Sequence, residues 1–127
     1  MDRTQDVAVL RVPGLHSTTL PLAAARSGTD VAILGFPDDG GLDVRPGVVG
    51  DTGDVLSDGS LRRVTALGGL IRHGNSGGPA VDASGHVQAT IFAAHVGGSR
   101  EGGYGVPAGP VRTALTRARA PVSTGAC

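Results

Sequence analysis

The chain has 127 residues, and its 11 basic residues balance 11 acidic ones, so the formal net charge is zero. That balance excludes the strongly basic surface that nucleic acids and anionic membranes select. With 22 glycines, 8 prolines and only 2% aromatic residues, the composition argues against a helical bundle and suits short strands joined by many turns. The length allows one domain or part of one.

The apolar pattern of the first half of the chain predicts three strands. Residues 7–12 are typical of a strand that stops at Pro13. Residues 31–36 form an apolar run, typical of a buried strand, which ends at Pro37. Residues 44–49 predict a third strand, although a proline and a glycine weaken its pattern.

The second half of the chain predicts further strands and one helix. Residues 61–70 are strand-like, and residues 79–81 and 87–96 flank a four-residue turn, which predicts a hairpin. Residues 104–106 predict a short last strand, and residues 111–119 place apolar side chains at helical spacing. The predicted fold class is therefore mostly β, with one C-terminal α-helix.

The hexapeptide Gly74-Asn75-Ser76-Gly77-Gly78-Pro79 carries the strongest functional signal. Glycines around a serine leave its hydroxyl uncovered and let a substrate backbone approach closely. The N–H groups of Gly74 and Ser76 are then placed to converge on the oxygen of an attacked carbonyl, as an oxyanion hole requires. The same composition also makes ordinary turns. As an ordered motif between two apolar segments, it favours a nucleophilic serine.

Several segments of the sequence are similar to those of a known protein family. They are residues 6–10, 28–37, 74–79, 103–108 and 122–127. The chain resembles the C-terminal part of a trypsin-fold serine protease, and is most similar to the actinobacterial membrane-anchored acid-resistance periplasmic proteases (the MarP type). The resemblance implies that residues 1–25 are a remnant of the first barrel and a linker, residues 26–108 the second barrel, and residues 109–120 the C-terminal helix of an incomplete protease domain.

The resemblance implies a role for each matching site residue. Ser76 becomes the nucleophile, and Asp6 the carboxylate that orients the catalytic histidine. Gly74 and Ser76 supply the oxyanion hole. Phe92, Ala93 and Ala94 become the edge strand that pairs with the substrate backbone.

Two further positions are implied to bind substrate. Leu70 stands at the floor of the specificity pocket, which predicts cleavage after an apolar or uncharged residue. His73 is placed to line that pocket, although an ordinary loop histidine fits the pattern as well. The implied partners are peptide or protein substrates, and no cofactor is implied.

The triad histidine has no counterpart in this sequence. The family order is His, Asp, Ser, yet no histidine precedes Asp6. His95 imitates the alanine-rich segment around a triad histidine, but it follows Ser76 and falls on the expected substrate strand. We therefore expect this polypeptide to lack proteolytic activity by itself, because triad members act as a unit.

Cys127 is the only cysteine, so its thiol is free, intermolecular or separated from a partner outside this sequence. The resemblance implies a disulfide with an upstream cysteine that this chain lacks. It also implies a periplasmic or extracytoplasmic location, with a membrane anchor only in segments absent here.

Three alternative functions can be weighed against the protease interpretation. Gly74 to Gly78 also satisfies the nucleophile elbow of α/β-hydrolases, but Pro79 and a strand follow where that fold needs a helix. A non-catalytic pseudoprotease that binds peptides through the Phe92 strand fits the absent histidine. A metal site fails, because the histidines and the cysteine show no paired ligand spacing.

Overall fold

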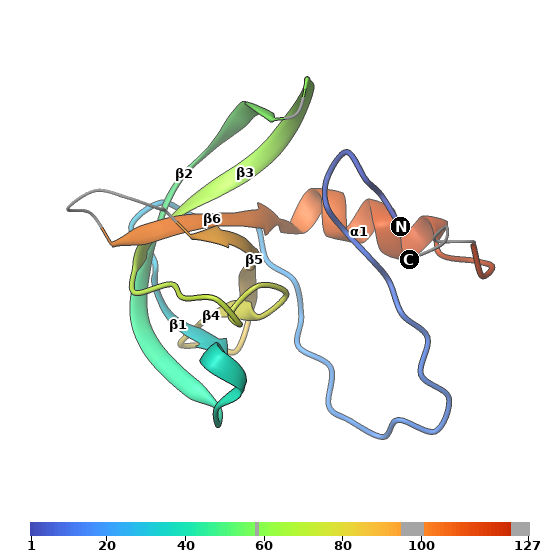
Figure 1. Ribbon diagram of the computed structural model, residues 1–127, viewed down its shortest axis with the longest axis horizontal. Coiled ribbons are helices and arrows are strands. Elements are labelled where there is room, and N and C mark those ends of the chain that lie inside the picture. Colours follow the sequence, from blue (N-terminus) through green and yellow to red (C-terminus); the bar gives the residue numbers. More distant parts are fainter. Residues whose placement is uncertain (58, 95–100, 123–127) are drawn as a thin grey trace.

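A computed structural model describes residues 1–57, 59–94 and 101–122. Its centre is a closed antiparallel barrel with the strand order β1-β2-β3-β6-β5-β4, and one helix extends to one side of it (Figure 1). The elements are β1 (Asp30–Gly35), a 3-10 turn (Pro37–Asp39), β2 (Asp43–Ser57), β3 (Ser60–Gly69), β4 (Pro79–Asp82), β5 (Val87–Ala94), β6 (Gly102–Pro107) and α1 (Ala108–Arg117). The predicted fold class is confirmed.

Aliphatic side chains fill the barrel. In β1, Val31 and Ile33 are 6% and 0% exposed, and they alternate with less buried residues as a strand with one face on the core requires. Val49, Leu67 and Ile91 meet them from β2, β3 and β5. Each large aliphatic side chain buried in this way contributes about 1.5–3 kcal/mol to folding. The core therefore closes without aromatic residues.

The strand β2 is much longer than the predicted residues 44–49. It pairs with β1 near its start and with β3 from Gly47 to Ser57, and a register shift between Val49 and Thr52 bends it. The β2–β3 hairpin extends away from the barrel (Figure 1). The apolar pattern did not predict this extension, because the outer half of the hairpin is rich in polar residues. An exposed hairpin does not need an apolar face.

The predicted strand at residues 7–12 is wrong. Asp2 and Val7 form an isolated bridge around a turn, and residues 8–12 carry no strand. Leu10 is 79% exposed. An apolar run becomes a strand only where a neighbouring strand accepts its hydrogen bonds, and no strand in the described ranges pairs with these residues. The C-terminal helix is confirmed, but it runs from Ala108 to Arg117 rather than over the predicted residues 111–119.

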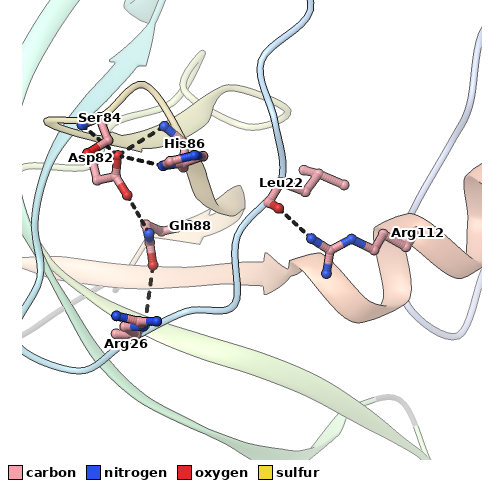
Figure 2. Close-up of polar contacts among 7 residues, drawn as sticks. All are labelled: Leu22, Arg26, Asp82, Ser84, His86, Gln88 and Arg112. Carbon is pink, nitrogen blue, oxygen red and sulfur yellow. Dashed lines mark hydrogen bonds and ion pairs between the residues drawn. The ribbon is translucent and has the colours of Figure 1, made fainter.

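The segment that leads into β1 is held against the barrel and the helix. The N–H of Val87 donates to Pro21 at 2.9 Å, and the Val87 carbonyl accepts the N–H of Ala23 at 2.9 Å. The Arg112 guanidinium of α1 donates to the carbonyl of Leu22 (Figure 2). These bonds lock residues 21–23 beside the start of β5.

A polar network continues from this segment into the β4–β5 turn (Figure 2). The Gln88 side chain, only 3% exposed, donates to Asp82 at 2.7 Å and accepts the N–H of Arg26 at 3.3 Å. The other oxygen of Asp82 accepts the N–H groups of Ser84 and His86. The His86 N–H is the main cause that holds the pKa of Asp82 below its usual value, and the Gln88 amide adds to it. Asp82 therefore works as the anchor of a turn.

In the part of the chain that the structure describes, no helix has the length and hydropathy needed to cross a membrane.

Candidate active site

The serine loop, which we define as residues 70–78, connects β3 to β4. Gly74 and Gly77 have positive φ angles of 91° and 84°, which only glycine adopts without strain. The N–H of Asn75 donates to Arg72 at 3.1 Å, that of Gly78 to Asn75 at 2.9 Å, and that of Gly77 to Ile91 at 2.7 Å. These bonds shape the loop into two successive turns and tie it to β5.

The hydrogen bonds of the loop leave several donors unused, among them the two on either side of Asn75. Within the described residues, the N–H groups of Gly74 and Ser76 donate to no acceptor, although those of Asn75, Gly77 and Gly78 all do. The Ser76 side chain is exposed. The loop therefore brings two N–H groups without a described acceptor together with an accessible serine hydroxyl.

Close backbone packing fixes this shape. A Cβ on Gly74 would lie 2.7 Å from Cα of Pro37 and closer still to the Phe36 carbonyl oxygen. Asn75 is 1% exposed, and a Cβ on Gly35 would meet its Cα at 2.8 Å. The loop thus rests directly on the backbone at the end of β1, and no side chain separates the two.

Ion pairs among Asp43, Arg45 and Arg72 connect the same loop to β2. Arg72 donates to Asp43 at 2.6 Å, and Arg45 donates to the same oxygen at 2.9 Å. Arg45 first, and then Arg72, holds the pKa of the Asp43 carboxyl below its usual value. Because Arg72 also accepts the Asn75 N–H through its carbonyl, the cluster is linked to the residue that precedes Ser76. The sequence analysis missed this pair, since 29 positions separate its members and no local pattern joins them.

The strand β5 continues past its partner on one side. Pairing with β4 ends at Thr90, and the serine loop then bonds Ile91. Phe92, Ala93 and Ala94 follow, and the pairs Ala93–Tyr104 and Ala94–Gly103 join β5 to β6 on the opposite side. Among the described strands, none pairs with residues 92–94 on the side of the serine loop. This open edge begins one residue after the bond to the loop.

Asp6 lies in the turn closed by the Asp2–Val7 bridge. Its side chain is exposed and its φ is +56°. Arg62 Nε donates to the Thr4 carbonyl at 3.0 Å, and the Arg63 N–H donates to the Gln5 side chain at 3.2 Å, so β3 holds this turn. No hydrogen bond or ion pair among the described residues joins Asp6 to Ser76.

The other predicted site residues take varied positions. Leu70 is half-buried just after β3, and His73 is exposed within the serine loop. His95 lies outside the described residues. Of the other histidines, His16 is exposed in the leading segment and His86 lies in the β4–β5 turn. In the described ranges, no three His, Cys, Asp or Glu side chains gather closely enough to hold a metal ion.

A closed six-stranded barrel with this serine loop and a C-terminal helix is the architecture of the trypsin-like serine peptidases. The chain belongs to that family, because the model of the trypsin-like peptidase domain matches residues 1–89. It is 34% identical to the serine protease Rv3671c of Mycobacterium tuberculosis H37Rv over 137 residues, which cover 99% of this chain and 34% of that protein. The chain spans about a third of the length of the curated relatives it matches.

Solved structures agree with this assignment. The crystal structure of the active form of the M. tuberculosis Rv3671c protease matches with a TM-score of 0.89 at 33% identity, covering 99% of this chain and 60% of that one. The HtrA-type protease AlgW with a decapeptide matches with a TM-score of 0.63 at 27% identity, covering 76% of this chain and 30% of that one. Both are proteases similar to this chain over its barrel.

Proposed function

We propose that this chain carries the nucleophile, the oxyanion donors and the substrate-binding edge of a serine endopeptidase. Ser76 Oγ attacks the carbonyl carbon of the scissile peptide bond, and an acyl-enzyme forms as the amine leaves. The N–H groups of Gly74 and Ser76 bind the oxygen that becomes negative in the tetrahedral intermediate. Each such donor is worth roughly 100- to 1,000-fold in rate.

The observation that carries this proposal is an exposed serine hydroxyl in a loop whose backbone N–H groups on both sides of the buried Asn75 are free. Among the described residues, the loop bonds the N–H groups of Asn75, Gly77 and Gly78, whereas those of Gly74 and Ser76, like those of residues 70–73, donate to no acceptor. The two free donors flank the buried Asn75 and come with the exposed hydroxyl of Ser76. Two free donors that flank one residue, next to an accessible hydroxyl, are what an oxyanion hole needs.

Asp6 is proposed as the carboxylate that orients the general base and stabilises it when protonated. The base is a histidine outside these 127 residues. Without it, Ser76 has no acceptor for its proton, so we propose that the 127-residue chain alone does not turn over peptides. The disulfide partner of Cys127 is proposed to lie outside the chain as well.

The substrate is proposed to be an extended peptide that pairs with Phe92, Ala93 and Ala94. The open edge of β5 supports this, because an unpaired edge offers backbone hydrogen bonds to an added strand. Leu70 and His73 are proposed to line the pocket for the residue before the scissile bond. Since Leu70 brings no charge, we expect cleavage after an uncharged residue, and a strong preference for Arg or Lys in a peptide library would contradict this.

A turnover assay separates the parts of this proposal. The isolated chain should release no more product from a peptide ester than its Ser76→Ala variant. A chimera that joins the preceding part of the Rv3671c protease to residues 1–127 should gain turnover, which Ser76→Ala abolishes and Ser84→Ala leaves intact. Ser84 is a matched control, because it is an exposed turn serine. Turnover by the isolated chain at an ordinary protease rate would refute its inactivity, and a folded chimera whose turnover survives Ser76→Ala would refute the nucleophile.

A second candidate is a non-catalytic peptide-binding role for the chain as it stands. The open edge at residues 92–94 favours it, since strand addition needs neither the histidine nor the serine. Unchanged peptide affinity in Ser76→Ala, combined with no turnover in the chimera, would support this role over the enzyme.

We also propose an extracytoplasmic location with a membrane anchor outside the 127 residues, as in the MarP-type proteases that the sequence resembles. Fractionation of cells expressing the full reading frame tests this, and recovery of the protein in the cytosol would contradict it.

A further inference from the structure

Arg62 stands beside the proposed substrate edge in an unusual arrangement. Its guanidinium carbon lies 5.3 Å from the centroid of the Phe92 ring, within the range of a cation–π contact. The Phe92 ring in turn stacks on Tyr104, with centroids 6.5 Å apart and planes at 28°. The three side chains come from β3, β5 and β6, which the barrel order places side by side. We call them the arginine platform.

The platform lies next to the serine loop through the backbone. Phe92 follows Ile91 directly, and Ile91 accepts the Gly77 N–H at 2.7 Å and donates to Gly78 at 2.9 Å. A peptide strand that pairs with residues 92–94 therefore runs past the platform just before it reaches Ser76. If the peptide pairs antiparallel to β5, it passes residue 94 before residue 92, so its side chains on that stretch belong to residues N-terminal to the scissile bond.

Among the described residues, no carboxylate neutralises the charge of Arg62. Its Nε is bonded to the neutral carbonyl of Thr4 at 3.0 Å, and no carboxylate of the described residues forms an ion pair with it. The neighbouring Arg63 differs, because it contacts both oxygens of Asp54 at 3.3 and 3.2 Å. The Phe92 ring and the Thr4 carbonyl hold the Arg62 guanidinium in place, and its terminal nitrogens can still donate hydrogen bonds to a ligand.

We propose that Arg62 is a specificity-determining residue that binds an acidic side chain of the substrate, two to four residues before the scissile bond. The proposal rests on the proposed peptide-binding edge. A guanidinium fixed over an aromatic face presents a planar pair of donors that matches a carboxylate, and less order is lost on binding than with a free side chain. Because the Arg62 side chain is only partly buried, we expect a preference of about 3- to 10-fold for an acidic residue over its neutral isostere.

The test measures peptide binding to the 127-residue chain, so it does not require catalysis. Fluorescently labelled, N-acetylated hexapeptides carry Asp or Glu, or the isosteric Asn or Gln, at the second, third or fourth position before the scissile bond. Fluorescence anisotropy at low salt gives each dissociation constant. The same titration in half-molar salt shows how much of the binding depends on charge, because salt screens exposed charges. The variants are Arg62→Gln, Arg62→Lys and the matched control Arg63→Gln, each checked for folding by circular dichroism.

We expect one position at which the wild-type chain prefers the acidic peptide and loses that preference in high salt. Arg62→Gln should remove the preference while neutral peptides bind within about twofold of wild type, because the backbone of residues 92–94 that pairs with the peptide is unchanged. Arg62→Lys should keep part of it, and Arg63→Gln should keep it all. Equal binding of acidic and neutral peptides by the wild type, or a preference that survives Arg62→Gln, would overturn the role of Arg62 and leave the edge strand standing. If no peptide of either kind binds, the proposed edge fails and this inference fails with it.

Discussion

The contact between the serine loop and the end of β1 predicts a large effect of the substitution Gly74→Ala. The new methyl group would lie 2.7 Å from Cα of Pro37 and closer to the Phe36 carbonyl oxygen, which are backbone atoms that a rotamer change does not move. The φ of +91° adds a second penalty, since a residue with a Cβ is strained there by about 1–2 kcal/mol. Overpacking of this kind typically costs about 1–3 kcal/mol more. We expect a total loss of about 2–5 kcal/mol in the free energy of unfolding.

Two other glycines separate these contributions. Gly77 also has a positive φ, of 84°, but nothing lies within 4 Å of its built Cβ, so Gly77→Ala should cost only the conformational term of about 1–2 kcal/mol. Gly53 in β2 has open space and no positive φ, and Gly53→Ala should change stability by less than about 0.5 kcal/mol.

Urea unfolding followed by far-ultraviolet circular dichroism measures all three variants. With a slope of about 2 kcal/mol per molar urea, the midpoint of Gly74→Ala should fall by about 1–2.5 M, if the slope itself stays at the wild-type value. A loss in Gly74→Ala no larger than that in Gly77→Ala would refute the reasoning, because the close approach to Phe36 and Pro37 would then carry no energy.

Three further predictions concern the core, the ion cluster and the buried amide. Ile33→Ala, at a fully buried core position, should lower the free energy of unfolding in urea by about 2–5 kcal/mol. Val44→Ala, at a position that is 53% exposed, should lower it by less than about 0.5 kcal/mol. Similar losses in the two variants would contradict the placement of Ile33 in the barrel interior. Because the pKa of Asp43 is lowered in the folded chain, the unfolded chain takes up that proton first on acidification, so the stabilisation should be complete above about pH 5 and lost below about pH 4. Urea midpoints should fall less steeply with acid in Asp43→Asn, and identical slopes would argue against the cluster. Gln88→Leu removes the amide that joins Asp82 to the Arg26 N–H and should cost about 1–3 kcal/mol by the same unfolding assay; a neutral result would show that water replaces the amide freely.

The strands that the sequence predicted well are those whose apolar residues form the barrel core. Residues 31–36 and 61–70 match β1 and β3 to within one residue at each end, because burial on one face imposes its own pattern on the side chains. Residues 7–12 show the limit of that reasoning. Their apolar side chains resemble a strand, yet hydrogen bonding to a neighbour decides whether one forms, and the sequence of a segment does not contain its neighbour.

What the sequence determined by itself is the chemistry that depends on local backbone conformation. Gly74 and Gly77 adopt positive φ, which glycine takes without strain, and they leave the side chain of Ser76 between them uncovered. Only the tertiary structure decided which side chains surround that loop. Arg72 meets Asp43 because β2 pairs with β3, and Arg62 meets Phe92 because the order β3-β6-β5 brings those strands together. Such contacts depend on strand order and register, which long-range packing sets and no short motif encodes.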